Sequence, residues 1–255
     1  MLKAVLFDLD DTLIDWGDFF EEWDAIEEPH LRNIHKYLTE NFPTPPTFEA
    51  YREAFSTRTR RTWSEARTSL IAPHLGKILL EAAVEVGLPE ADLDIEAFLD
   101  AYRWGKIPGT VVFPDVPAGL ANLRDRGVRF GMVTNAFQPM RLRDIELQEH
   151  GLLEFFPECR FSAADVGHLK PHHLIFERAL ECLGTSPEET VFVGDNPTAD
   201  IAGAQSAGMR AILRVTTRRR PMLSGVIVPD AAINSLAEMP AIFDLWFPGW
   251  GEQQT

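Results

Sequence analysis

Residues 3–13 read KAVLFDLDDTL, and this stretch decides the fold of the chain. Its first five residues form a short apolar run with valine and phenylalanine, which is the pattern of a parallel strand buried on both faces. The run stops at Asp8, and two more acids follow, Asp10 and Asp11. Aspartates after a strand are typical of helix and turn caps, but like charges gathered at one place also need a cation or a proton. The spacing alone leaves both interpretations open.

An apolar run that ends at polar residues returns three times downstream, over residues 128–133, 190–193 and 210–215. Between the runs lie helical patterns that begin near a proline or a histidine and end just before a glycine, as helices often do. Strands that alternate with helices of this length predict right-handed βαβ units. The fold class is therefore α/β, with a Rossmann-like, three-layer core around a parallel sheet. In such sheets ligands bind at the carboxyl ends of the strands.

The alternation stops between about residues 16 and 109, where no strand pattern appears and apolar residues fall at helical spacing. We expect an inserted all-helical domain over residues 16–107, and we call it the helical insertion. Residues 1–15 and 108–255 then form the α/β core. A chain of 255 residues is long for one minimal domain and suits a core with a smaller insertion.

Smaller features refine this division of the chain. Gly17 and residues 105–108 are the candidate hinges of the helical insertion, because hinges are often small residues. Pro29 predicts a kink or a break in the first helical pattern. Beyond the core, we expect a last strand over residues 231–233 and a last helix over residues 235–243.

The bulk composition excludes several classes of protein. Hydrophobic residues make up 45% of the chain and charged residues 25%, which is an ordinary globular balance. The formal net charge of −15 opposes nonspecific nucleic-acid binding. No stretch has the length and apolar character of a signal peptide or a membrane span. We therefore expect no nucleic-acid or membrane partner, a small-molecule substrate, and a monomer or homodimer.

The chain has two cysteines, Cys159 and Cys182. Two are too few for a disulfide framework, and free cysteines are usually buried. We therefore expect inert core thiols in a reducing compartment, which places the protein in the cytoplasm.

A second acidic cluster changes the interpretation of the first one. The motif GDNPTAD places Asp195 and Asp200 after another apolar run, at the start of a helix. If the two strands are neighbours in one parallel sheet, their acids converge on one crevice. Carboxylate oxygens are the ligands that a hard cation such as Mg²⁺ prefers. The pair of clusters therefore predicts a magnesium site.

Three more polar residues accompany these clusters. Thr134 and Asn135 end the run over residues 128–133, and Lys170 precedes Pro171. Each has an ordinary structural interpretation, since a threonine can end a strand and a lysine can lie on the surface. The four motifs together, in this order, favour a common site.

The motifs DLDDTL, VTN, the lysine of HLKP, and GDNPTAD resemble those of the haloacid dehalogenase superfamily of phosphotransferases. The resemblance covers about residues 3–15 and 110–215. The position of the helical insertion just after the first motif is similar to the helical cap type of that superfamily. The resemblance implies a Mg²⁺-dependent phosphatase that acts on small phosphorylated metabolites.

Carried over residue by residue, the resemblance also implies roles. Asp8 attacks phosphorus and forms an aspartyl phosphate, and Asp10 serves as the general acid and base. Asp8, Asp195 and the backbone carbonyl of Asp10 are the expected metal ligands. Asp200 holds either the water shell of the metal or the catalytic lysine.

The remaining implied roles concern the transferring phosphoryl group. The hydroxyl of Thr134 and the backbone N–H of Asn135 bind its oxygens, and Lys170 offsets their charge and orients the nucleophile. Thr12 orders the turn after the first strand. Asp11 is expected to be a cap or a solvent-facing residue.

The helical insertion is expected to select the substrate, because a lid over the crevice contacts the leaving group. Five arginines crowd one of its segments: Arg52, Arg58, Arg60, Arg61 and Arg67. Such a cluster can bind a second phosphate or a carboxylate, or it can face solvent or pair with the acidic segment before it. The sequence does not choose between these.

Other functions remain open at this point. A phosphomutase has the same core, and a non-catalytic phosphate-binding module can keep the fold. A dehalogenase has no leaving alkoxide to protonate, so the presence of Asp10 favours phosphate chemistry.

Overall fold

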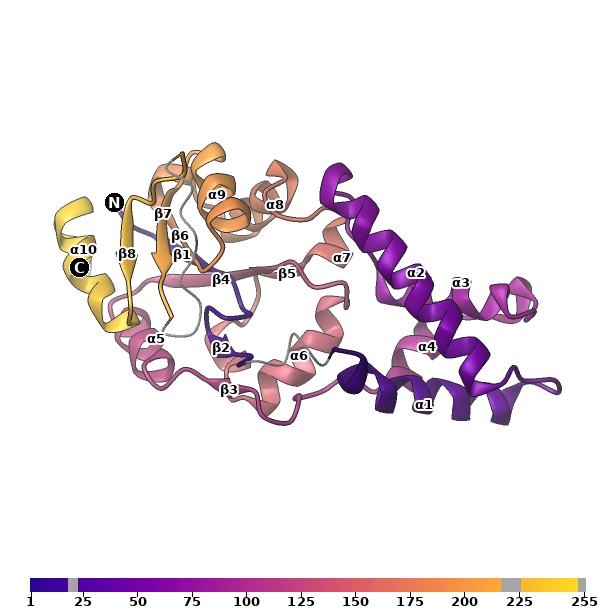
Figure 1. Ribbon diagram of the computed structural model, residues 1–255. Coiled ribbons are helices and arrows are strands. Elements are labelled where there is room, and N and C mark those ends of the chain that lie inside the picture. Colours follow the sequence, from indigo (N-terminus) through magenta and orange to yellow (C-terminus); the bar gives the residue numbers. More distant parts are fainter. Residues whose placement is uncertain (18–22, 217–225, 252–255) are drawn as a thin grey trace.

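The computed structural model describes residues 1–17, 23–216 and 226–251, and its centre is a parallel sheet in the order β5-β4-β1-β6-β7-β8 (Figure 1). All five neighbouring pairs are parallel. The strands are β1 (Ala4–Phe7), β4 (Arg129–Thr134), β5 (Arg160–Ser162), β6 (Thr190–Gly194), β7 (Arg210–Arg214) and β8 (Ala231–Ile233). The first motif therefore leaves the sheet from a central strand, between the strands that carry VTN and GDNPTAD.

Helices cover both faces of the sheet, and the burial of the side chains of β1 on both faces shows this. Its residues are fully buried, and successive side chains point to opposite faces. Val5 and Phe7 pack in the core on one side, and Ala4 and Leu6 pack on the other. On the first side lie α5 (Val116–Asp125), α6 (Met140–Glu149) and α10 (Met239–Trp246); on the second lie α8 (His173–Leu183), the π-helix η5 (Pro197–Ala202) and α9 (Gly203–Ser206) (Figure 1).

Short elements complete the α/β core. They are α7 (Ala163–Val166), η3 (Leu153–Phe155), η4 (Pro187–Glu189) and η6 (Leu236–Glu238). No helix in the described ranges has both the length and the apolar character that crossing a membrane requires.

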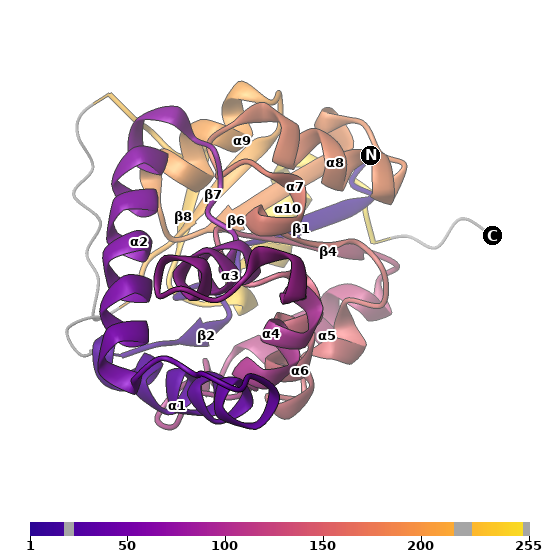
Figure 2. The ribbon, with the colours of Figure 1, turned by 90° about the vertical axis from the view of Figure 1, so that its right-hand side faces the viewer.

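Four helices lie together beside the core, to the right in Figure 1 and toward the viewer in Figure 2. They are α1 (Trp23–Asn41), α2 (Phe48–Ser69), α3 (Leu75–Glu85) and α4 (Ile95–Tyr102), with the short η2 (Glu90–Asp92) before the last one. The chain leaves and re-enters the core through an antiparallel ribbon of β2 (Ile14–Asp15) and β3 (Val111–Val112). The two connections of the helical group are therefore side by side.

Most of the expected elements are confirmed, including the last strand and a last helix. The three-residue β5 was not predicted, because it is too short to show a pattern. The break expected at Pro29 is wrong: α1 continues through it. Burial of Leu31, Ile34 and Leu38 on the same helix offsets the hydrogen bond that proline cannot make.

The expectation of two free thiols is also wrong, because Cys159 and Cys182 form a disulfide. The bond joins the segment before β5 to the last turn of α8, which are 23 residues apart in the sequence. A single pair of cysteines gives no sequence signal for pairing, because only the fold brings the two residues together.

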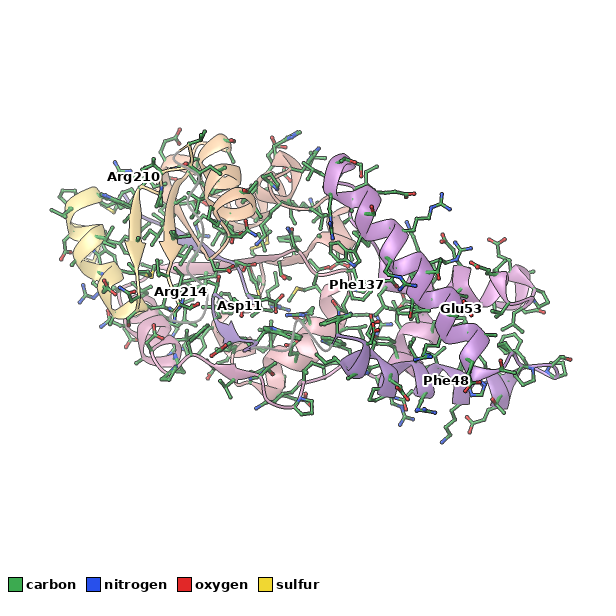
Figure 3. The ribbon with its side chains drawn as sticks, in the orientation of Figure 1. Asp11, Phe48, Glu53, Phe137, Arg210 and Arg214 are labelled. Atoms are coloured by element: carbon green, nitrogen blue, oxygen red, sulfur yellow. A yellow bond between two sulfur atoms is a disulfide. The ribbon has the colours of Figure 1, made fainter. Side chains whose placement is uncertain are left out.

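An ion pair of the buried Arg214 joins β7, near the carboxyl terminus of the chain, to the start of α5. The guanidinium of Arg214 on β7 donates to Asp115 at 2.8 and 3.0 Å, and Asp115 also accepts from the backbone N–H of Leu236. Only 2% of Arg214, which Figure 3 labels, is exposed to solvent. One carboxylate therefore connects β7, α5 and η6.

Candidate active site

The predicted polar residues gather at the carboxyl end of the sheet, because β4, β1 and β6 are adjacent and parallel. Asp8 and Asp10 follow β1, and Thr134 and Asn135 lie at the end of β4. Asp195 follows β6. Their convergence depends on strand order.

Lys170 is the buried centre of this cluster. Its Nζ lies 2.6 Å from Asp8 Oδ1 and 2.7 Å from Asp200 Oδ1, and it donates to the carbonyl of Val133 at 2.9 Å. Burial alone lowers the pKa of a lysine, but the charges of Asp200 and Asp8 raise the pKa of Lys170 above its ordinary value. The ammonium therefore stays protonated and holds two carboxylates in place.

The side chain of Asn135 positions this lysine. Its Oδ1 accepts from the backbone N–H of Lys170 at 2.7 Å, and its Nδ2 donates to the Lys170 carbonyl at 3.1 Å. The sequence indicated only a backbone role for Asn135, and the structure adds this side-chain contact. Thr12 likewise does more than order a turn, since its hydroxyl donates to Asp8 Oδ2 at 3.2 Å.

Three carboxylates form a group that fits a metal ion. Oxygens of Asp8, Asp195 and Asp200 lie within 4.8 Å of one another. Burial, and after it the charges of Asp8 and Asp200, raises the pKa of Asp195 to about 8. Burial also raises the pKa of Asp8 to about 7, against the opposing charge of Lys170. One lysine does not balance three acids, of which Asp8 and Asp200 are buried and Asp195 is half-buried, and oxygen donors of this kind fit Mg²⁺.

A glycine allows this group to be so compact. A Cβ atom at Gly194 would lie 2.3 Å from Asp200 Oδ2, which is far inside contact distance. The same carboxylate oxygen accepts from the backbone N–H of Asn196 at 2.9 Å. The glycine of GDNPTAD therefore lets Asp200, in the first turn of η5, approach the end of β6.

The side chain of Asp10 takes part in a different set of contacts. Its Oδ1 accepts from Trp16 Nε1 at 2.7 Å and from Arg143 Nη2, and its Oδ2 accepts from Thr134 Oγ1 at 3.2 Å. The three-carboxylate group does not include it. The expected contribution of Asp10 to metal binding was its backbone carbonyl, and that stays a prediction.

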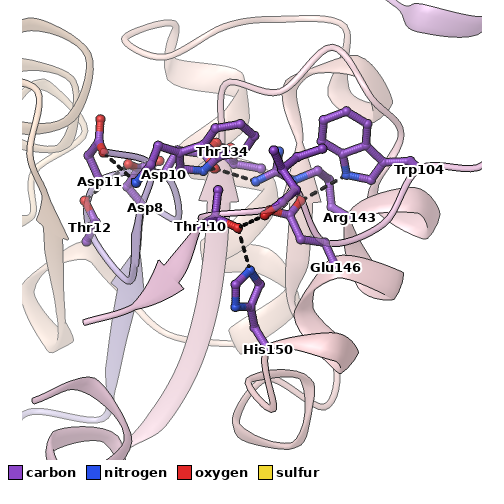
Figure 4. Close-up of polar contacts among 12 residues, drawn as sticks. Asp8, Asp10, Asp11, Thr12, Trp104, Thr110, Thr134, Arg143, Glu146 and His150 are labelled. Atoms are coloured by element: carbon purple, nitrogen blue, oxygen red, sulfur yellow. Dashed lines mark hydrogen bonds and ion pairs between the residues drawn. The ribbon is translucent and has the colours of Figure 1, made fainter. Parts of the chain in front are cut away.

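Arg143 extends these contacts away from the nucleophile (Figure 4). It is 2% exposed, and its Nε lies 3.2 Å from Glu146 Oε2, which also accepts from Trp104 Nε1 at 3.0 Å. Its guanidinium lies 5.8 Å from the ring of Trp16 and 5.9 Å from that of Trp104. The tryptophans at the two ends of the helical insertion therefore contact one arginine.

Sequence reasoning missed Arg143, Glu146 and the roles of both tryptophans. The available signal was the position of the arginine and the glutamate, three residues apart on the helix that directly follows the VTN strand. Trp104 is 2% exposed.

Two roles were expected for Asp11, a cap or a solvent-facing residue, and the second is wrong. It is 6% exposed, adopts a left-handed φ of 59°, and accepts from the backbone N–H of Trp16 at 3.3 Å (Figure 3). Aspartate tolerates this conformation better than most residues. It therefore acts as a turn cap, which was the other interpretation.

A cleft of about 640 Å³ lies between the core and the helical insertion. The core contributes Asp10, Asn135, Ala136, Phe137, Gln138 and Arg143; the helical insertion and its first connection contribute Trp16, Trp23, Thr59, Arg60, Trp63 and Arg67. The rings of Trp63 and Phe137 meet across it with centroids 6.1 Å apart. The general acid candidate thus faces a space that side chains of α1 and α2 close.

The comparisons with known proteins agree with this architecture. The family model of the haloacid dehalogenase-like hydrolases matches residues 2–208. A glyceraldehyde 3-phosphate phosphatase of Methanothermobacter thermautotrophicus is 31% identical over 84% of this chain and 85% of its own length. A phosphoserine phosphatase of Thermus thermophilus is 31% identical over 83% of this chain and 88% of its own length.

Two further proteins are similar over almost the whole chain. The pyrophosphatase PpaX of Bacillus cereus is 33% identical over 96% of this chain and 98% of its own length. Among solved structures, a 2-haloacid dehalogenase from Pseudomonas syringae superposes with a TM-score of 0.64 at 27% identity, covering 96% of this chain and all of that one. The named relatives thus include phosphatases and a dehalogenase.

Proposed function

The chain belongs to the haloacid dehalogenase-like hydrolases, and from this premise we propose that it is a Mg²⁺-dependent phosphatase that hydrolyses small phosphomonoesters through an aspartyl phosphate on Asp8. One observation carries the choice of phosphate chemistry. A second carboxylate, that of Asp10, faces the cleft and is held there by Thr134, Trp16 and Arg143. A reaction needs such a carboxyl group when its leaving group is an alkoxide, because an alkoxide departs poorly without a proton.

In the first step, Asp8 attacks phosphorus, and the bond between phosphorus and the leaving oxygen breaks as the new bond forms. Asp10 gives its proton to that oxygen, so the leaving group departs as an alcohol. In the second step, Asp10 removes a proton from water, which attacks the same phosphorus. The bond to Asp8 breaks, and inorganic phosphate and the free carboxylate result.

Other residues bind and orient the reacting groups. Lys170 holds Asp8 in position and offsets the charge of the phosphoryl oxygens, together with the hydroxyl of Thr134 and the backbone N–H of Asn135. Asp8 and Asp195 would hold Mg²⁺, with the carbonyl of Asp10, and Asp200 supports the lysine at 2.7 Å. The ion supplies positive charge that lets two anions approach each other.

We also propose that residues 16–107 act as a cap over a core of residues 1–15 and 108–255. The side-by-side connections through β2 and β3 support this division, because they let the helices move as one group. A cytoplasmic location stays a prediction, and the disulfide between Cys159 and Cys182 argues against a strongly reducing compartment.

Three other functions compete with this one. The structural similarity to a 2-haloacid dehalogenase favours dehalogenation, but that reaction has no leaving alkoxide that Asp10 would protonate. A phosphomutase needs a group that transfers a proton to a second hydroxyl, and a non-catalytic module needs no nucleophile. The relatives are named for different substrates, two of them phosphomonoesters and one pyrophosphate, so their names do not identify one substrate for this chain.

The test is hydrolysis of phenyl phosphate and of ethyl phosphate by the purified protein, with Mg²⁺ and with a chelator. We expect metal-dependent turnover that Asp8→Asn abolishes and that the exposed control Asp92→Asn leaves unchanged. Asp10→Asn should reduce turnover of ethyl phosphate more than that of phenyl phosphate, because phenolate leaves without a proton. Turnover that survives Asp8→Asn would contradict the nucleophile assignment, and release of halide from a 2-haloacid would favour the dehalogenase.

A further inference from the structure

The arginines of α2 divide into two groups. Arg58 pairs with Glu81 and Glu85 of α3 at 2.9 Å each, and Arg61 pairs with Glu65 of its own helix at 2.9 Å. These contacts are internal to the helical insertion. They explain two of the five clustered arginines as surface ion pairs, which contribute little to stability.

Arg60 and Arg67 differ from that group in both place and partners. Together with Thr59 and Trp63, they line the cleft that contains Asp10. Their positions in the chain place them along one face of α2 over two helical turns. Within the described ranges, no carboxylate lies within ion-pair distance of either guanidinium. Among the described residues, two positive charges without an ion-pair partner therefore line the cleft that contains Asp10.

The charges of the cleft are opposite to those of the whole protein. The chain carries a formal net charge of −15, whereas the described residues that line the cleft include three arginines and one carboxylate. Arg143 is already engaged by Asp10 and Glu146. The positive charge left in the cleft comes from Arg60 and Arg67, and a local field of this sign attracts anions into a low-dielectric space.

The position of these arginines specifies which part of a substrate they reach. In the proposed reaction the phosphoryl group lies at Asp8, the leaving oxygen lies at Asp10, and the rest of the leaving group extends into the cleft. Trp16, Trp23 and Trp63 line that space, so its walls suit a flat or apolar group. Arg60 and Arg67 line the same space, so their guanidinium groups can meet a group that the leaving group carries there.

We propose, on the basis of the proposed function, that the leaving group carries a second anionic group, a carboxylate or a phosphate, and that Arg60 and Arg67 bind it. Guanidinium matches the oxygens of both groups with two parallel hydrogen bonds. Burying part of the leaving group against tryptophan strengthens these bonds by excluding water. The two arginines thus determine which leaving group is accepted, and residues of the α/β core carry out the bond-breaking steps.

The test uses three substrates that share one ring: phenyl phosphate, 4-carboxyphenyl phosphate and 1,4-phenylene bisphosphate. We expect the wild-type kcat/KM to be about tenfold or more higher for an anionic member, the range expected for one charged hydrogen bond. Arg60→Met and Arg67→Met should each remove most of this advantage, with a much smaller loss on phenyl phosphate. Arg52→Met, an exposed arginine of the same helix outside the cleft, is the matched control and should change nothing.

The outcomes separate this inference from the function on which it rests. A preference for only one anionic member identifies carboxylate or phosphate as the group that is bound. Equal kcat/KM on all three substrates, or a preference that persists in the double variant Arg60→Met/Arg67→Met, overturns the inference and leaves the phosphatase standing. If no member of the series is hydrolysed in an Asp8-dependent manner, the proposed function and the inference fail together.

Discussion

Glu27 of α1 gives a prediction whose sign and size follow from its surroundings. Its side chain is only 4% exposed, and its Oε1 has no hydrogen-bond partner among the described residues. Burial raises the pKa of Glu27 from 4.5 to about 7, which the side chain of Trp23 opposes by donating a hydrogen bond. The carboxyl therefore stays protonated in the folded protein well above the pH at which it ionises in the unfolded chain.

The difference between the pKa of Glu27 in the folded and unfolded states sets the direction in which stability changes with pH. Between pH 4.5 and about 7 the unfolded chain has lost the proton and the folded protein still holds it, so stability falls as the pH rises. Above pH 7 the loss is complete. A rise in pKa of this size corresponds to about 3 kcal/mol. Glu27→Gln removes the ionisation and keeps the shape of the side chain.

The assay is urea unfolding of the wild type and of Glu27→Gln, followed by tryptophan fluorescence, from pH 5 to pH 8.5. The free energy of unfolding of the variant minus that of the wild type should be about 1 kcal/mol or less at pH 5 and rise to about 3 kcal/mol above pH 7. Other titrating groups, such as Asp8 and Asp195, are present in both proteins and cancel in the difference. Glu53→Gln, exposed on α2 (Figure 3), should give a flat difference, and a flat difference for Glu27→Gln would refute the reasoning.

Three further predictions concern buried charges. Lys170→Met should reduce kcat/KM for aryl phosphates by about 10²–10³-fold, because it removes a positioned donor; loss of less than tenfold would show that the lysine is only structural. Arg143→Met should reduce hydrolysis of ethyl phosphate more than that of phenyl phosphate, because the arginine holds Asp10, the proposed general acid, and an equal loss on both would contradict that role. Asp115→Ala leaves the Arg214 guanidinium, 1% exposed, without its partner and should lower the free energy of unfolding by about 3–5 kcal/mol. Urea unfolding measures this loss, and the double variant with Arg214→Met should recover part of it; no recovery would contradict the account.

The sequence was sufficient to predict the sheet and the motifs of the candidate site, because both are local patterns. A buried strand reads as an apolar run, and the polar residues that follow it lie at the carboxyl edge of any parallel sheet. Asp8, Asp10, Thr134, Asn135 and Asp195 could therefore be placed together before their distances were known. The helical nature of residues 16–107 followed in the same way from the spacing of apolar residues.

Tertiary structure alone decided which side chains meet across long separations. Arg143 lies 133 residues from Asp10 in the sequence, and the one local signal, a glutamate three residues further along its helix, does not indicate that it contacts Asp10. Packing also divided the five arginines of α2 into two that pair with glutamates, two that line the cleft, and Arg52, which among the described residues does neither. The local sequence pattern specifies which face of a helix or strand is buried. It does not specify which element packs against that face, and the role of a charged side chain depends on that neighbour.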